Sequence, residues 1–285
     1  MNGKETFSLP GGAEIPRVGL GVWMIPDEQT EAAVCEAFRM GYRHVDTAQA
    51  YGNEAGVGRA LRGAGLAREE IFVTSKVAAE HKTYREAADS IDGSLLRMKT
   101  DYLDLMLIHS PQPWAEFRGP RRYFEENREV WRAMEDAQRA GKLRAIGVSN
   151  FLVDDLESLL AGCTIRPVVH QLLAHPGNLP QAILDFCRRE GILCEAYSPL
   201  GHGEALKNPA VRAAAAHTGA SEAQVCLRFL LDEGLVVLPK AGKPEHMRRN
   251  LELDFELSPQ DRAALRETAF ADYGEHAHFP VFSGR

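Results

Sequence analysis

The sequence predicts a single-domain α/β protein with a (β/α)₈ TIM barrel, on three observations. Eight short runs rich in β-branched residues alternate with longer amphipathic stretches along the 285 residues, and this order is typical of parallel sheets. Eight such units at this length favour a closed barrel, with a doubly wound open sheet as the alternative. No linker or composition shift divides the chain, so we expect one domain over residues 1–285.

A hairpin is expected before the barrel. The opening "TFSLPGGAEIPRV" alternates around Pro10-Gly11-Gly12, a pattern typical of a β-hairpin, and we expect it to plug the bottom of the barrel. The eight strand-like runs that follow are "RVGLGV", "YRHVD", "EIFVTSK", "DYLDLMLIH", "KLRAIGVSN", "PVVHQ", "ILCEAYS" and "LVVLPK".

Capping signals mark the helices between these runs. Ser or Thr three residues before Glu or Gln predicts a capping box, a polar residue before proline predicts a helix start, and glycine after an apolar face predicts a helix end. In chain order the signals are Gly41, Thr83 with Glu86, Asn208-Pro209, Ser221 with Gln224, Gly234 and Ser258-Pro259.

Composition excludes several function classes. The chain is 45% hydrophobic and 26% charged with a net charge of −7, which argues against a nucleic-acid partner because binding a polyanion needs a basic face. No stretch approaches the roughly 20 apolar residues that span a bilayer, and no leader pattern opens the chain. We expect a cytoplasmic monomer with no membrane partner. Five scattered cysteines without a C-x-x-C pair predict free thiols rather than disulfides or a zinc site, so no metal is expected.

Polar groups close seven of the eight strand-like runs. In a barrel the carboxyl ends of the strands face the active site, whereas each such residue alone is more often a helix cap, a surface lysine or a core histidine. Because polar residues stand at seven strand ends, we predict one polar site at the carboxyl end of the barrel. These residues are Asp46, Lys76, His109, Ser149 with Asn150, Gln171, Tyr197 with Ser198, and Lys240.

Four residues of neighbouring strand ends indicate acid catalysis on an oxygen. A lysine ammonium lowers the pKa of a nearby tyrosine by favouring phenolate, so Lys76 would activate Tyr51. Asp46 would hold Lys76 charged, and His109 would orient the oxygen that Tyr51 protonates. Protonating an oxygen while its carbon is attacked describes carbonyl reduction. Since no side chain supplies hydride, a nicotinamide cofactor and a small-molecule carbonyl substrate are expected.

The cofactor would not be bound by a Rossmann motif. No G-x-G-x-x-G follows the first strand, and "GVGRAL" lies in a helical stretch. Barrels bind phosphate after strands seven and eight, where "LVVLPKAGKPEHMRRN" places several basic residues around a helix start at Pro244. An ordinary basic helix face is the alternative explanation for that segment.

These motifs together resemble the aldo-keto reductases, and bacterial 2,5-diketo-D-gluconate reductase-like members in particular. The stretch "GYRHVDTAQAYGNEAGVG" is similar to the first family signature, and "TSK" and "LIH" carry the family's Lys and His. The resemblance implies the catalytic residues Asp46, Tyr51, Lys76 and His109. It implies NADPH as cofactor, with NADH as a weaker alternative. The implied cofactor contacts are Gly21, Val22, Ser149, Asn150, Gln171, Tyr197, Ser198, Leu200, Lys240, Ala241, His246, Arg249 and Asn250.

Departures from the family pattern concern the substrate pocket and the phosphate loop. Ser110 and Ala78 stand where many members carry tryptophans, so a wider pocket is expected, walled by Trp23 and Trp114 and covered by the C-terminal tail. Ala241 and His246 stand where relatives often carry a hydroxyl donor and an arginine, so we expect only a moderate NADPH preference. A His-x-His pair in that tail is too little for a metal site.

Two other functions remain open from the sequence. The barrel could be a poorly active NADPH sensor, although the complete set of four catalytic residues favours turnover. It could also be a Schiff-base lyase with Lys76 as nucleophile.

Overall fold

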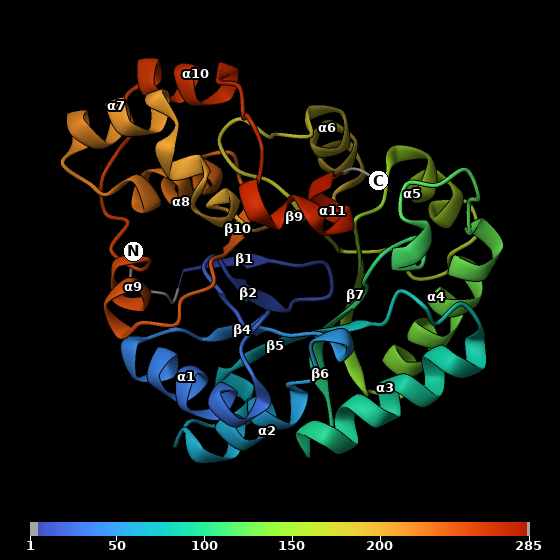
Figure 1. Cartoon of the computed structure of the whole chain (residues 1–285). Helices are drawn as coiled ribbons and strands as arrows, with labels where there is room; N and C mark the ends of the chain where they lie inside the picture. Colours follow the sequence, from blue (N-terminus) through green and yellow to red (C-terminus); the bar gives the residue numbers. More distant parts are fainter. Residues whose placement is uncertain (1–4, 284–285) are drawn as a thin grey trace.

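The computed structural model describes residues 5–283 and shows a (β/α)₈ barrel (Figure 1). Residues 1–4 and 284–285, which the single-domain prediction also covers, lie outside the described part. Within it, eight parallel strands pair in the order β3 to β10, and a parallel bridge between Val18 and Val237 joins the first to the last. The strands are β3 (Leu20–Gly21), β4 (His44–Asp46), β5 (Phe72–Val77), β6 (Leu103–Ile108), β7 (Leu143–Ser149), β8 (Val169–Leu173), β9 (Leu193–Tyr197) and β10 (Val236–Leu238).

Each predicted strand-like run overlaps one of these strands, so the predicted architecture is confirmed. Helices ring the strands in Figure 1 and cover their outer face. The helices are α1 (Asp27–Met40), α2 (Glu54–Gly63), α3 (Tyr84–Met98), α4 (Phe124–Arg139), α5 (Val153–Leu160), α6 (Gln181–Glu190), α7 (Pro209–Thr218), α8 (Glu222–Asp232), α9 (Pro244–Arg249), α10 (Pro259–Glu267) and α11 (Pro280–Ser283). None of the helices among residues 5–283 is long and apolar enough to cross a membrane.

The N-terminal hairpin closes the amino end of the barrel. Its strands β1 (Thr6–Ser8) and β2 (Glu14–Pro16) are antiparallel, and the turn places Gly11 and Gly12 at φ of 92° and 85°, which glycine adopts without steric cost. Leu9 and Ile15 are buried against the first residues of β5, β8 and β10 inside the barrel. The hairpin therefore fills the interior of the barrel at this end with apolar side chains.

The predicted capping signals are present. The Thr83 hydroxyl accepts a hydrogen bond from the Glu86 amide at the start of α3, and the Glu86 carboxylate accepts one from the Thr83 amide. Gly41 ends α1 with a φ of 109° and donates to the last carbonyls of that helix. These local signals set where each helix leaves and returns to the barrel.

The two glycines of "GVGRAL", Gly56 and Gly58, allow α2 to lie close to its neighbours. A Cβ on Gly56 would lie 2.6 Å from the Asp27 carbonyl oxygen of α1, and one on Gly58 would lie 2.2 Å from the Met98 carbonyl oxygen at the end of α3. Both glycines therefore serve helix packing rather than phosphate binding. This close packing fixes α2 directly behind the loop that carries Tyr51.

Candidate active site

A cavity of about 660 Å³ opens at the carboxyl end of the barrel. Its floor is made by strand ends, including Asp46, His109 and Gln171, and its walls by the loops after them. The C-terminal segment from His276 to Phe282 also lines it, so the tail covers the opening as the sequence predicted. The structure thus brings residues from distant parts of the chain to one mouth.

An ion pair between Lys76 and Asp46 lies at the floor of this cavity. Lys76 Nζ lies 2.8 and 2.7 Å from the two Asp46 carboxylate oxygens and donates to the Thr47 carbonyl oxygen at 2.9 Å. The exposed fractions are 0% for Lys76 and 4% for Asp46. Burial works to lower the pKa of Lys76, but attraction to Asp46 and Tyr51 outweighs it and raises that pKa above its ordinary value. The ammonium is therefore held charged, as expected from the sequence.

Tyr51 presents its hydroxyl to this ion pair. Lys76 Nζ lies 3.4 Å from Tyr51 Oη, and the phenol stands in the short helix Gln49–Tyr51 that follows β4. Burial raises the pKa of the Tyr51 hydroxyl, and Lys76 offsets part of the rise. The expected effect of Lys76 is therefore present, although burial has the stronger effect and the net direction is upward. Tyr51 stays protonated at neutral pH and can donate a proton.

His109 follows β6 and faces the same space. Its ring contacts the Tyr51 ring edge to face at 5.6 Å between centroids, and the Trp114 ring at 5.1 Å. Burial, with a smaller contribution from Lys76, lowers the pKa of His109 well below its ordinary value. The imidazole is neutral near pH 7, so it can donate only the hydrogen bond that its tautomer allows.

The opposite side of the cavity carries amide and hydroxyl groups. Asn150, with a φ of 63°, donates through Nδ2 to the His109 carbonyl oxygen and to Ser149 Oγ, at 3.0 and 3.1 Å. Tyr197 donates through its hydroxyl to Asn150 Oδ1 at 2.7 Å. Ser149, Asn150, Gln171, Tyr197 and Ser198 all line the cavity, as do Gly21 and Leu200, whereas Val22 is buried behind it.

Gln171 links this side to the ion pair. Its Nε2 donates to Asp46 Oδ1 at 2.8 Å and to Glu195 Oε2 at 3.1 Å. Both hydrogens of Gln171 Nε2 are donated to these two carboxyl groups. The carbonyl oxygen of Gln171 is therefore the end of the side chain left to accept a hydrogen bond from a ligand.

Glu195 is the site residue that the sequence did not single out. It is fully buried in β9, and burial together with the nearby Asp46 raises the pKa of Glu195 to about 8, so its carboxyl is protonated at neutral pH. Strand alternation was the available signal: Glu195 precedes Tyr197 by two residues and therefore shares its face of the strand.

The basic segment lies beside the cavity and after β10. Lys240 lines the cavity, is exposed, and approaches the Met24 carbonyl oxygen at 3.5 Å. Pro244 begins α9 as predicted. His246 is exposed on that helix, Arg249 pairs with Glu245 at 3.4 Å, and Ala241 and Asn250 are buried.

The four expected substrate residues divide into two groups. Trp23 and Trp114 line the cavity. Ser110 is fully buried, with its carbonyl oxygen accepting from Lys82 Nζ at 3.0 Å, and the Ala78 amide donates to Gln49 Oε1 at 2.9 Å. Neither is among the residues that line the cavity. The tail instead supplies aromatic rings: Phe279 contacts Trp23 at 5.0 Å, and His276 stacks on His202 at 4.2 Å.

The comparisons with known proteins identify the family of the chain. A model of the Aldo/keto reductase family matches residues 16–269. The chain belongs to the aldo/keto reductase family. It is 42% identical over 261 residues to a glyoxal reductase of Bacillus subtilis, a match covering 90% of each chain. The crystal structure of an aldo/keto reductase from Brucella melitensis matches with a TM-score of 0.86 and 37% identity, over 92% of this chain and 98% of that one.

A further solved relative carries a cofactor. The Bombyx mori aldo-keto reductase in complex with NADP matches with a TM-score of 0.84 and 31% identity over 92% of each chain. Carbonyl reduction with a nicotinamide cofactor is the general reaction of aldo/keto reductases. The family and the barrel that the sequence predicted are therefore confirmed.

The role of Glu195 can be measured through cofactor binding. Glu195→Leu removes one acceptor from Gln171 Nε2, so the amide loses one of the two hydrogen bonds that orient it. The loss of one hydrogen bond, about 0.5–1.5 kcal/mol, should raise the KM for the nicotinamide cofactor roughly 2- to 10-fold. Glu195→Gln is the matched control, because its side-chain oxygen can still accept. A changed melting temperature with an unchanged KM in the leucine variant would show that Glu195 serves only the core.

Proposed function

We propose that this aldo/keto reductase reduces aldehydes or ketones with NADPH, and that Tyr51 donates the proton. The observation that carries the proposal is the contact of the Tyr51 hydroxyl with the buried Lys76–Asp46 pair at the floor of the cavity. Asp46, Tyr51, Lys76 and His109 are the proposed catalytic residues. A small carbonyl compound is the proposed substrate, and a cytoplasmic monomer remains our prediction.

The residues of the cavity fit a nicotinamide. Asn150 and Ser149 offer polar side chains, and Gln171 offers the carbonyl oxygen that its two donor contacts leave free, which suits the amide of a carboxamide. Tyr197 adds an aromatic ring at the same wall. The bound cofactor would supply hydride to the substrate carbon. We assign Gly21, Val22, Ser198 and Leu200 to the same contact region.

Proton transfer is the part that the chain itself performs. As hydride adds to the carbonyl carbon, negative charge develops on the oxygen, and Tyr51 gives its hydroxyl proton to that oxygen. Lys76 stabilises the resulting phenolate, while Asp46 keeps the ammonium in place. Neutral His109 orients the carbonyl by a hydrogen bond from its ring N–H.

The charge of Lys76 favours reduction over a Schiff-base lyase. A lysine nucleophile must lose its proton, whereas Asp46 and Tyr51 raise the pKa of Lys76. Its ammonium also donates to three oxygen acceptors. Reduction with borohydride in the presence of a carbonyl compound should therefore leave Lys76 unmodified.

NADPH is the preferred cofactor in this proposal because basic groups follow β10. Lys240 and Arg249 flank the region where the adenosine phosphate would lie, with Asn250 beside them. Ala241 and His246 weaken the preference relative to residues with a hydroxyl or a permanent charge, so NADH is a weaker alternative. The Arg249 contact with Glu245 reduces the charge that α9 offers.

Tyr51→Phe tests the proton donor. Removing the hydroxyl should lower turnover on the order of 10²-fold or more, the scale of general acid catalysis, with cofactor affinity nearly unchanged. Steady-state kinetics and cofactor binding by fluorescence measure the two quantities. Tyr84→Phe is the control, because it removes a hydroxyl that donates to Asp136 between α3 and α4. Near-normal turnover in Tyr51→Phe would refute the assignment.

His246→Arg tests the phosphate contact. Arginine keeps its charge and can bind a phosphate bidentately, so the ratio of kcat/KM for NADPH over NADH should rise several-fold. NADH lacks the 2′-phosphate and is the internal control, since its kcat/KM should stay constant. An unchanged ratio would mean that His246 does not reach the phosphate.

A further inference from the structure

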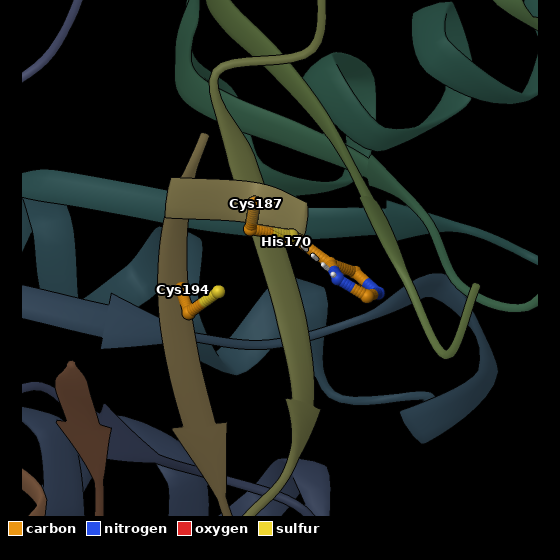
Figure 2. Close-up of side chains that lie close together, drawn as sticks. All are labelled: His170, Cys187 and Cys194. Carbon is orange, nitrogen blue, oxygen red and sulfur yellow. Dashed lines mark hydrogen bonds between the residues drawn. The ribbon is translucent and has the colours of Figure 1, made fainter. Parts of the chain in front are cut away.

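Three potential metal ligands meet outside the active-site cavity. His170 lies on β8, Cys187 on the last turn of α6, and Cys194 on β9. Figure 2 shows the two sulfur atoms and the imidazole converging between the helix and the two strands. The ligand atoms lie within 4.8 Å of one another, and His170 Nδ1 lies 3.5 Å from Cys187 Sγ.

The barrel itself creates this convergence. His170 and Cys194 are direct partners in the parallel register of β8 and β9. Their neighbours Gln171 and Glu195 reach Asp46 or each other inside the barrel, so strand alternation turns His170 and Cys194 outward toward the helix layer. Helix α6 ends at Glu190, and Gly191 with a φ of 70° returns the chain into β9, which places Cys187 above both strands.

The donor set and spacing suit a thiophilic cation. Zinc binds thiolate sulfur at about 2.3 Å and imidazole nitrogen at about 2.0–2.1 Å, so ligand atoms of a tetrahedral site lie roughly 3.5–3.8 Å apart. The 3.5 Å separation of His170 Nδ1 and Cys187 Sγ meets that spacing. Thiolate ligands select Zn²⁺ and Cu⁺ over hard cations.

Charge and burial also fit. The exposed fractions of His170, Cys187 and Cys194 are 0%, 0% and 7%, so an unbalanced charge here would be costly. Two thiolates and a neutral imidazole carry a charge of −2, which Zn²⁺ cancels and Cu⁺ reduces to −1, so the charge favours zinc of the two. By contrast, Cys35 and Cys163 contact backbone carbonyl oxygens of neighbouring helix residues, the ordinary situation of a half-buried thiol.

We propose that His170, Cys187 and Cys194 bind one thiophilic d¹⁰ cation, Zn²⁺ or Cu⁺, at a three-ligand site separate from the active site. Binding releases one proton from each thiol and oxidises nothing. The ion ties α6 to β8 and β9, the strands that carry Gln171 and Tyr197. The sequence predicted free thiols without a metal because no two cysteines have a C-x-x-C spacing. In the barrel, the register of β8 and β9 places His170 beside Cys194.

Metal titration of the untagged full chain tests the proposal. After treatment with a chelator and a reductant, Zn²⁺ and Cu⁺ are added separately, Cu⁺ under anaerobic conditions with a competing chelator. One equivalent should be retained after desalting, measured by elemental mass spectrometry. At a 100-fold excess over the Kd the melting temperature should rise by roughly 5 °C. The ion bound more tightly in these two arms is the one that the site selects.

Variants locate the bound ion. Cys194→Ser and His170→Gln should each lose the bound ion and the rise in melting temperature. Cys163→Ser should keep both. Retention of the ion in Cys194→Ser, or no retention in the parent chain with either cation, would overturn the proposal.

A measurement on the parent chain does not depend on whether a variant folds. Alkylation followed by peptide mass spectrometry should show that the added ion slows modification of Cys187 and Cys194 at least 10-fold, with Cys35 and Cys163 unaffected. Equal rates with and without the ion would also overturn the proposal. Neither readout uses the reductase activity, so the outcome is independent of the proposed function.

Discussion

The buried ion pair between Lys76 and Asp46 is the interaction on which the rest of the active site depends. Burying two charges costs several kcal/mol per ion unless their remaining hydrogen-bonding capacity is met. Here both Asp46 carboxylate oxygens contact the Lys76 ammonium. The Thr47 carbonyl oxygen accepts a further hydrogen bond from that ammonium, and Gln171 donates one to Asp46. Removing one partner alone would leave an uncompensated buried charge. The pair therefore needs a rigid frame, and the barrel supplies it.

The frame works because the two ends of the barrel differ. The hairpin fills the amino end with apolar side chains, and the strand ends at the other side carry the polar groups. Neighbouring strands β4, β5 and β6 place Asp46, Lys76 and His109 side by side. Tyr51 and Gln171 then take positions defined by the ion pair, one as its hydrogen-bonding neighbour and one as the link to Glu195.

The sequence was informative where local chemistry decides the structure. Strand runs, helix caps and the polar strand ends follow from residue patterns alone, and the structure confirms the strands and caps. Asp46 and Lys76 could be paired from the sequence because strands next to each other in the chain are also neighbours in a parallel barrel. Trp114 could be placed at the cavity because it follows the same strand end as His109.

What the sequence missed depends on which way a side chain points in three dimensions. Ser110 and Ala78 lie near the mouth in the chain, yet neither is among the residues that line the cavity. In the sequence, nothing distinguishes Glu195 from other strand residues. Its burial beside Asp46 is known only from the structure. The net pKa direction of Tyr51 also needed burial, since distance to Lys76 gives only the opposing contribution.

The pH dependence of single-turnover carbonyl reduction in Lys76→Met tests the central claim most directly. The double variant Lys76→Met/Asp46→Asn, which replaces the pair by neutral groups, is measured beside it, and cofactor binding verifies that both fold. The account predicts a loss on the order of 10²-fold in both variants and a shift of the alkaline limb to higher pH, because Tyr51 loses the cation that lowers its pKa. A parent-like rate and pH profile in a folded variant would contradict it.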